Sequence, residues 1–167
     1  MTAPDPHELT PPLRRHPALR PLSREHMGGL IHARDLQNAA DTEPALRGET
    51  IRRFLEAWHS EIAAHFDDEE RLLGPLIRDP VLRERLLSEH RTLRALAEKC
   101  ESDARAACEP ATLIELGRLL HDHIRWEERV LFEAIQAEHP AALAQLEPQS
   151  ADIESRRPGA KARQARL

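Results

Sequence analysis

The stretch HFDDEERLL, residues 65–73, places a histidine four positions before a glutamate. The same pattern, HxxxEERxL, returns as HIRWEERVL at residues 123–131. In an α-helix, residues at i and i+4 lie on one face, about 6 Å apart along the axis. Each stretch therefore predicts a helix that presents an imidazole and a carboxylate on the same side.

The rest of the sequence also favours helices over strands. Leu, Ala, Glu and Arg dominate, whereas aromatic residues make up only 3% of the chain. Capping residues, prolines and glycines delimit four segments. The predicted helices run from Ser23 to about residue 40, from 44 to 73, from the N-cap Asp79 to about 105, and from 110 to about 139. Because the connections are short, we expect an all-α protein, an antiparallel up-down-up-down four-helix bundle.

The two ends of the chain differ from its middle. Residues 1–21 hold six of the 13 prolines, which predicts an extended N-terminal arm. Residues 148–167 are polar, basic and poor in apolar side chains, which predicts a disordered tail. The bundle is therefore expected in residues 22–147.

Composition excludes several classes of protein. The net charge is −5 and the middle of the chain is strongly acidic, which argues against binding nucleic acid. The sequence contains no run of about 18 apolar residues, so no membrane span is predicted. The N-terminus also lacks the apolar core of a secretion signal. The two cysteines, Cys100 and Cys108, are too few for a disulfide framework. We therefore expect a cytoplasmic protein.

Each predicted helix places one histidine on its apolar face, and two of the helices add a glutamate one turn later. The inward positions, helix by helix, are His26, Leu30, Ala33 and Ala40; Ile51, Leu55, Trp58, Ile62, His65, Glu69, Leu72 and Leu76; Leu82, Leu86, His90, Leu93, Ala97 and Cys100; and Leu113, Leu116, Leu120, His123, Glu127, Val130 and Ala134. This spacing in steps of three and four is typical of a helix that faces a bundle core.

Carboxylates buried among leucines are costly unless positive charge meets them. No Lys or Arg lies on these stripes near the two glutamates, but four imidazoles do. A metal site would satisfy all six groups, with the two glutamates bridging two ions. Mixed imidazole and carboxylate ligands suit iron, manganese or zinc. The candidate ligands are His26, His65, Glu69, His90, His123 and Glu127.

For any single motif the alternative is a hydrogen-bonded core histidine or a solvated surface pair. The agreement of all four helices favours the metal site. The remaining histidines lie in the arm, at a helix end or off the stripes: His7, His16, His32, His59 and His139. His121 lies about 200° around the helix from His123 and is predicted not to be a ligand.

In order and spacing, these motifs resemble the hemerythrin-like (HHE cation-binding) domain family over about residues 20–147. The matching phrases are LSREHMGGL, HFDDEERLLGPL, LLSEHRTLRAL and HIRWEERVLF. The resemblance implies an antiparallel four-helix bundle, a non-haem di-iron centre and oxygen-linked chemistry. It also implies that the four histidines are terminal ligands and that Glu69 and Glu127 bridge the irons.

The sequence departs from the oxygen-carrying members of that family, which have a fifth histidine one turn after the third-helix ligand. Here that position is Arg94, whose guanidinium cannot ligate. The last motif contains both Glu127 and Glu128, but only Glu127 lies on the apolar face of the predicted helix. The site therefore resembles a four-histidine, two-glutamate variant with a water or an open position.

Two functions of different kinds are consistent with this site. The first is a di-iron protein that binds or senses oxygen, peroxide, nitric oxide or iron. Signalling by it would need a partner or metal-dependent folding, and a protein partner or a homodimer is consistent with this function. The alternative is a peroxide-consuming (catalase-like) or oxidase enzyme; the absence of Tyr excludes a tyrosyl-radical mechanism. A third hypothesis is a metal-free bundle that acts as an interaction module through its basic tail.

Overall fold

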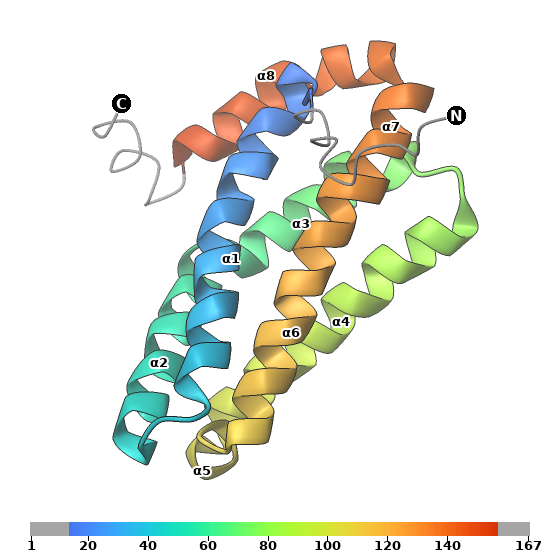
Figure 1. Ribbon diagram of the computed structural model, residues 1–167. Coiled ribbons are helices and arrows are strands. Elements are labelled where there is room, and N and C mark those ends of the chain that lie inside the picture. Colours follow the sequence, from blue (N-terminus) through green and yellow to red (C-terminus); the bar gives the residue numbers. More distant parts are fainter. Residues whose placement is uncertain (1–13, 157–167) are drawn as a thin grey trace, which may run out of the picture.

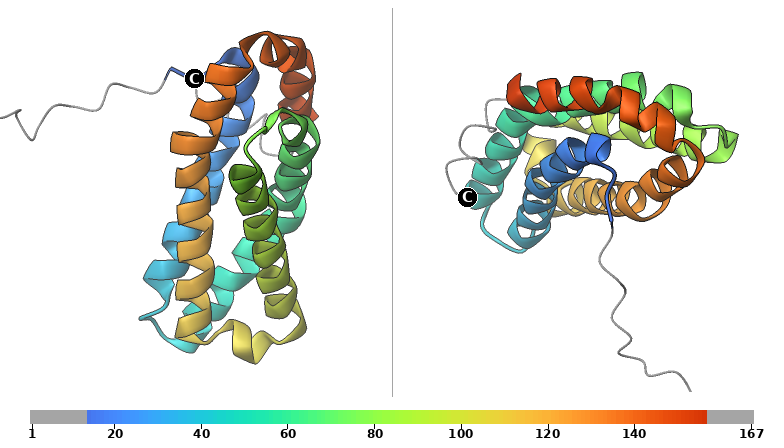
Figure 2. Two further views of the ribbon diagram at one scale, coloured as in Figure 1. Left: turned by 90° about the vertical axis from the view of Figure 1, so that its right-hand side faces the viewer. Right: turned by 90° about the horizontal axis from the view of Figure 1, so that it is seen from above.

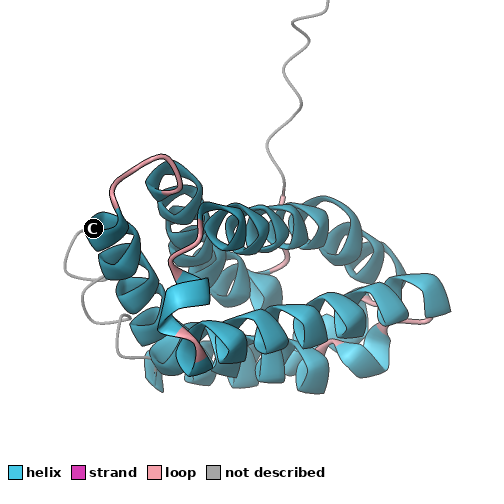
Figure 3. Cartoon of the chain, turned by 90° about the horizontal axis from the view of Figure 1, so that it is seen from below, coloured by secondary structure: helices cyan, strands magenta, loops and turns pink. Residues whose placement is uncertain are grey.

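The computed structural model describes residues 14–156, and all regular structure in that range is helical (Figure 3). The helices are η1 (Pro17–Leu19), α1 (Arg20–Ala39), α2 (Pro44–Ala57), η2 (Trp58–Ile62), α3 (Ala63–Leu72), η3 (Gly74–Leu76), α4 (Pro80–Ser102), α5 (Ala104–Ala107), α6 (Pro110–Trp126), η4 (Glu127–Leu131), α7 (Phe132–Glu138) and α8 (Pro140–Arg156). Four rods form an antiparallel bundle, as predicted: α1, α2–η2–α3, α4 and α6–η4–α7 (Figure 1). None of the helices in the described range is both long and apolar enough to cross a membrane.

The helix boundaries show where local sequence decides the fold. Asp79 caps α4 as predicted, because its carboxylate accepts a hydrogen bond from the Val81 amide at 2.8 Å. The predicted N-cap of the first helix is wrong. The helix begins at Arg20, and Ser23 lies inside it, where its hydroxyl donates to Glu128 at 2.6 Å.

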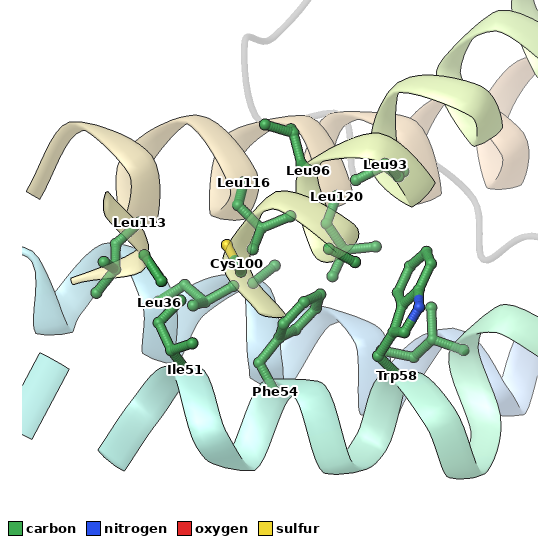
Figure 4. Close-up of a cluster of buried hydrophobic side chains, with 14 of the residues drawn as sticks. Leu36, Ile51, Phe54, Trp58, Leu93, Leu96, Cys100, Leu113, Leu116 and Leu120 are labelled. Carbon is green, nitrogen blue, oxygen red and sulfur yellow. The ribbon is translucent and has the colours of Figure 1, made fainter. Parts of the chain in front are cut away.

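Two clusters of buried apolar side chains fill the bundle at different levels. Figure 4 shows the first cluster, which joins α1, α2, α4 and α6. Its largest buried members include Leu36, Phe54, Trp58, Leu93, Leu113, Leu116 and Leu120. The second cluster includes Leu19, Leu22, Leu72, Leu86, Leu131, Phe132, Leu143 and Ile153. On each rod the candidate ligands lie where members of one cluster give way to members of the other, so apolar side chains flank the site on both sides.

Two of the rods contain a π-helical turn, which holds more residues than an α-helical turn and shifts the register of the residues after it. In η4 this shift begins at Glu127. The predicted inward residue Val130 is 43% exposed, whereas Leu131 is fully buried, and the stripe continues at Ile135 instead of Ala134. The prediction for Val130 is therefore wrong because it assumed an unbroken α-helix.

The C-terminal part of the described chain lies across one end of the bundle as α8 (Figure 2). Its residues Leu143 and Ile153 are buried, and the Ser150 hydroxyl donates to the carbonyl oxygen of Ala18 at 2.5 Å. The tail predicted to begin at residue 148 is thus helical as far as Arg156. The remainder of the predicted tail, 157–167, and residues 1–13 of the predicted arm lie outside the described residues.

Candidate metal centre

The structure brings all six predicted ligand side chains together between the two apolar clusters. Each is at most 5% exposed, and four of them are completely buried. Their sources are α1 for His26, α3 for His65 and Glu69, α4 for His90, α6 for His123 and the start of η4 for Glu127. The site is therefore built by all four rods, and its assembly depends on the whole bundle.

The six residues divide into two overlapping groups. Glu69, His90, His123 and Glu127 form one group, in which the candidate ligand atoms all lie within 4.8 Å of one another. His26, His65 and Glu69 form the other by the same measure. Because Glu69 belongs to both groups, it is shared by the two candidate cation sites.

Glu127 also reaches both groups. Its Oε1 lies 3.2 Å from Nε2 of His123, and its Oε2 lies 3.2 Å from Nε2 of His26. Glu69 is placed in the same way, with Oε1 at 3.1 Å from Nε2 of His65 and Oε2 at 3.5 Å from Nε2 of His90. Two carboxylates thus stand between two pairs of imidazoles.

Most inward-facing atoms of the site lack ordinary hydrogen-bond partners; the exceptions are Nε2 of His90 and Nε2 of His123, which lie 3.0 Å apart. Both carboxylate oxygens of Glu69 and of Glu127, and the Nε2 atoms of His26 and His65, are buried without a hydrogen bond. Such atoms are rare in folded proteins because each loses its hydration and gains nothing. Cations between them would satisfy every one of these atoms, so the donor set fits a pair of metal ions.

On their outer sides the four imidazoles are held by four other glutamates. The Nδ1–carboxylate distances are 2.7 Å for His65 and Glu25, 2.8 Å for His90 and Glu70, 2.8 Å for His123 and Glu89, and 2.6 Å for His26 and Glu128. A carboxylate at Nδ1 keeps the proton there and leaves the Nε2 lone pair facing the centre. This is the tautomer that a metal ligand needs.

These outer glutamates were missed by the sequence prediction, although the sequence contains a signal for them. Each one directly adjoins a candidate ligand, at positions 25, 70, 89 and 128. One residue is a 100° step around a helix, so its side chain faces the neighbouring rod. Each rod accordingly supplies a carboxylate to the histidine of the next, in a closed circle. Glu128 is part of this circle, while Glu127 faces the centre.

The charges of the centre stabilise one another. Burial opposes charge on His65 and His123, but nearby carboxylates, chiefly Glu69 for the former and Glu127 for the latter, outweigh it and raise each pKa to about 9. Burial likewise opposes charge on Glu69, yet the surrounding imidazoles hold its pKa well below its usual range. Without metal, the site is therefore a compact cluster of carboxylates and imidazolium ions at neutral pH.

Three of the histidines predicted not to be ligands have partners outside the centre. His121 is 44% exposed on its side chain and pairs with Asp122, and His59 pairs with Glu101. Nδ1 of His16 accepts a hydrogen bond from the Ala18 amide and caps η1.

A family model described as the hemerythrin HHE cation binding domain matches residues 18–135. The chain belongs to this family. No match was found among curated proteins or among solved structures. The hemerythrin domain so matched includes all six candidate ligands and ends before α8. Together, the family and the buried cluster of His and Glu side chains indicate a metal-binding protein.

Proposed function

We propose that this hemerythrin-family chain is a non-haem di-iron protein that binds or senses dioxygen or another small redox-active molecule, such as peroxide or nitric oxide. The observation that supports this most directly is the pair of ligand groups that share Glu69. Imidazole and carboxylate donors without thiolates suit iron, and manganese or zinc could substitute. Two irons held in this way would supply redox electrons and a coordination position for the small molecule.

A cavity of about 30 Å³ supports access for a small ligand. It is bordered by His26 and His65, the histidines of one ligand group, and by Phe66, Leu120 and Ile124. A space of this size holds about two water molecules, and therefore a diatomic or triatomic molecule rather than an organic substrate. A binding or sensing function fits these dimensions.

The polar part of the same cavity favours a second function, the consumption of peroxide. His32 and Glu61 line the cavity beside Glu25. Burial lowers the pKa of His32, although Asp35 and Glu61 oppose the effect, so the imidazole is neutral near pH 7. A neutral imidazole can take up and return a proton, which peroxide cleavage requires and reversible oxygen binding does not.

The first experiment is iron analysis of the anaerobically loaded full chain, together with its optical spectrum. We expect two irons per chain in the wild type and in His121→Ala, because His121 lies outside the centre. In His123→Ala we expect at least one iron to be lost. Equal iron in the two variants, or less than one iron in the wild type, would contradict the proposed centre.

A second experiment separates the two functions. Catalytic loss of hydrogen peroxide by the iron-loaded chain, reduced at least tenfold in His32→Ala with both irons retained, would support the enzyme. A reversible oxygen or nitric oxide adduct without peroxide turnover would support binding or sensing.

A further inference from the structure

Three of the four site histidines share an arrangement that goes beyond their outer glutamates. In each case an arginine binds the glutamate and also lies over an aromatic ring that packs against the same histidine. The three sets of arginine, glutamate, aromatic ring and histidine are Arg15, Glu128, Phe132 and His26; Arg94, Glu70, Phe66 and His90; and Arg85, Glu89, Trp126 and His123. We call each set an arginine clamp.

The clamp on His90 shows the geometry most clearly. Nη1 of Arg94 donates to Glu70 at 2.8 Å, and Nη2 donates to Asp67 at 2.8 Å. The guanidinium carbon lies 5.8 Å from the centre of the Phe66 ring. The Phe66 ring in turn stacks on the His90 imidazole, with 4.0 Å between centroids and 6° between planes. His90 is thus held both at Nδ1 and across its face.

The clamp on His26 is the most deeply buried. The Arg15 side chain is 7% exposed and donates to the Glu128 carboxylate at 2.6 Å and to the Glu128 carbonyl oxygen at 2.7 Å. Its guanidinium carbon lies 5.1 Å from the centre of the Phe132 ring, which stacks on His26 at 5.5 Å. Arg15 lies before the region that matches the family model, in the segment predicted to be an irregular arm.

The clamp on His123 repeats the pattern at the edge of the bundle. Arg85 donates to Glu89 at 2.7 Å and lies 4.5 Å from the centre of the nearest Trp126 ring. Trp126 packs against His123 with 6.2 Å between ring centroids. The same connections therefore hold histidines on three different rods.

We propose that Arg15, Arg85 and Arg94 are positioning residues of the metal centre. A planar guanidinium fixes a carboxylate through directed hydrogen bonds and lies flat on an aromatic ring, which an ammonium group does poorly. Because the carboxylate and the ring are both fixed, the imidazole is held in one orientation. Its Nε2 then faces the cation position even in the metal-free protein. The arginines thus act on metal retention without touching metal.

This inference rests on the proposed metal centre but not on iron or on oxygen, so cobalt serves as the probe. The full chain is loaded with Co²⁺ and its release to excess chelator is followed by the visible spectrum. Outer groups that orient histidine ligands contribute about 10- to 100-fold to metal affinity, so for Arg94→Met we expect about tenfold faster release of at least one Co²⁺. Arg94→Lys should restore part of the loss, since an ammonium can pair with the carboxylates but lacks the planar group that lies over the Phe66 ring.

Matched variants separate positioning from general stability. Arg91→Met is the control, because Arg91 lies on the same helix and pairs only with the exposed Glu84 in the described contacts. Its release rate should equal that of the wild type. In a Glu70→Gln background, Arg94→Met should have a smaller effect than in the wild type, because one of the two contacts through which the arginine acts on His90 is already weakened.

NMR signals of the histidine side chains show which histidine each arginine holds in position. In the Zn²⁺-loaded, ¹⁵N-labelled chain, Arg94→Met should shift the Nδ1–H signal of His90 and leave that of His26 in place. Arg15→Met should do the reverse. Wild-type release together with unmoved histidine signals in the folded variants, Arg94→Lys included, would overturn the positioning role alone. Failure of the wild type to retain two Co²⁺ would overturn the metal centre as well, and with it the proposed function.

Discussion

Removing metal should make the stability of the protein depend steeply on pH between 6.5 and 9. In the metal-free site the pKa values of His65 and His123 are raised from 6.5 to about 9. A group with a raised pKa stabilises the fold fully below its unfolded value, and the contribution is lost as the pH rises through the folded value. For each imidazole the change corresponds to about 3 kcal/mol of unfolding free energy. The pair should lose less than twice that amount, because both interact with the same two carboxylates.

The carboxylates of Glu69 and Glu127 determine how the stability of the metal-free protein changes at acid pH. The pKa values of Glu69 and Glu127 lie below 4.5, so their contribution is present above that pH and is lost as the pH falls. The metal-free protein should therefore be most stable between about pH 4.5 and 6.5. In the loaded protein the imidazoles are neutral ligands, so stability should change little from pH 6.5 to 9, and metal binding near pH 7 should release protons.

Urea unfolding of the metal-free and loaded chain at pH 6, 7.5 and 9 tests this account. His123→Ala should reduce the loss between pH 6 and 9 in the metal-free chain by up to about 3 kcal/mol, whereas His121→Ala should leave it unchanged. A metal-free stability that is flat or rises from pH 6.5 to 9 would refute the description of the site as a cluster of paired charges.

Three further predictions concern packing. Gly117→Ala should lower the unfolding free energy by about 1–3 kcal/mol, because the added Cβ would lie 2.7 Å from the carbonyl oxygen of Ala33; urea unfolding measures this. Gly28→Ala is its control and should raise stability by up to about 1 kcal/mol, since nothing lies within 4 Å of that Cβ; a loss at both positions would contradict the packing. Ile153→Ala should cost about 2 kcal/mol or more, measured in the same way, if α8 is part of the cooperative fold; no loss would show that α8 is dispensable.

The helices and the inward-facing polar residues could be predicted because they depend on local sequence. The HxxxE spacing places His65 with Glu69, and His123 with Glu127, on one face whatever surrounds them. The prediction failed at Val130 because it assumed an unbroken α-helix, whereas the π-helical turn in η4 shifts the register of the residues after Glu127. The helical continuation to Arg156 had a signal, the apolar spacing of Leu143, Leu146 and Ile153, but it was masked by the polar composition around it.

The partners of the outer groups could not be predicted, for a different reason. Glu70 and Arg94 are ordinary surface residues on helical wheels, and their roles depend on which rods are neighbours. Only the three-dimensional arrangement shows that Arg94, at the place where a fifth histidine would be expected, instead binds the carboxylate that orients His90.

The central claim is that these residues hold two metal ions. Anomalous diffraction at the iron edge from crystals of the iron-loaded chain tests it most directly. The account predicts two peaks in the bundle interior, one beside His26 and His65 and one beside His90 and His123, with Glu69 and Glu127 between them. A single peak, or peaks away from these six side chains, would contradict it.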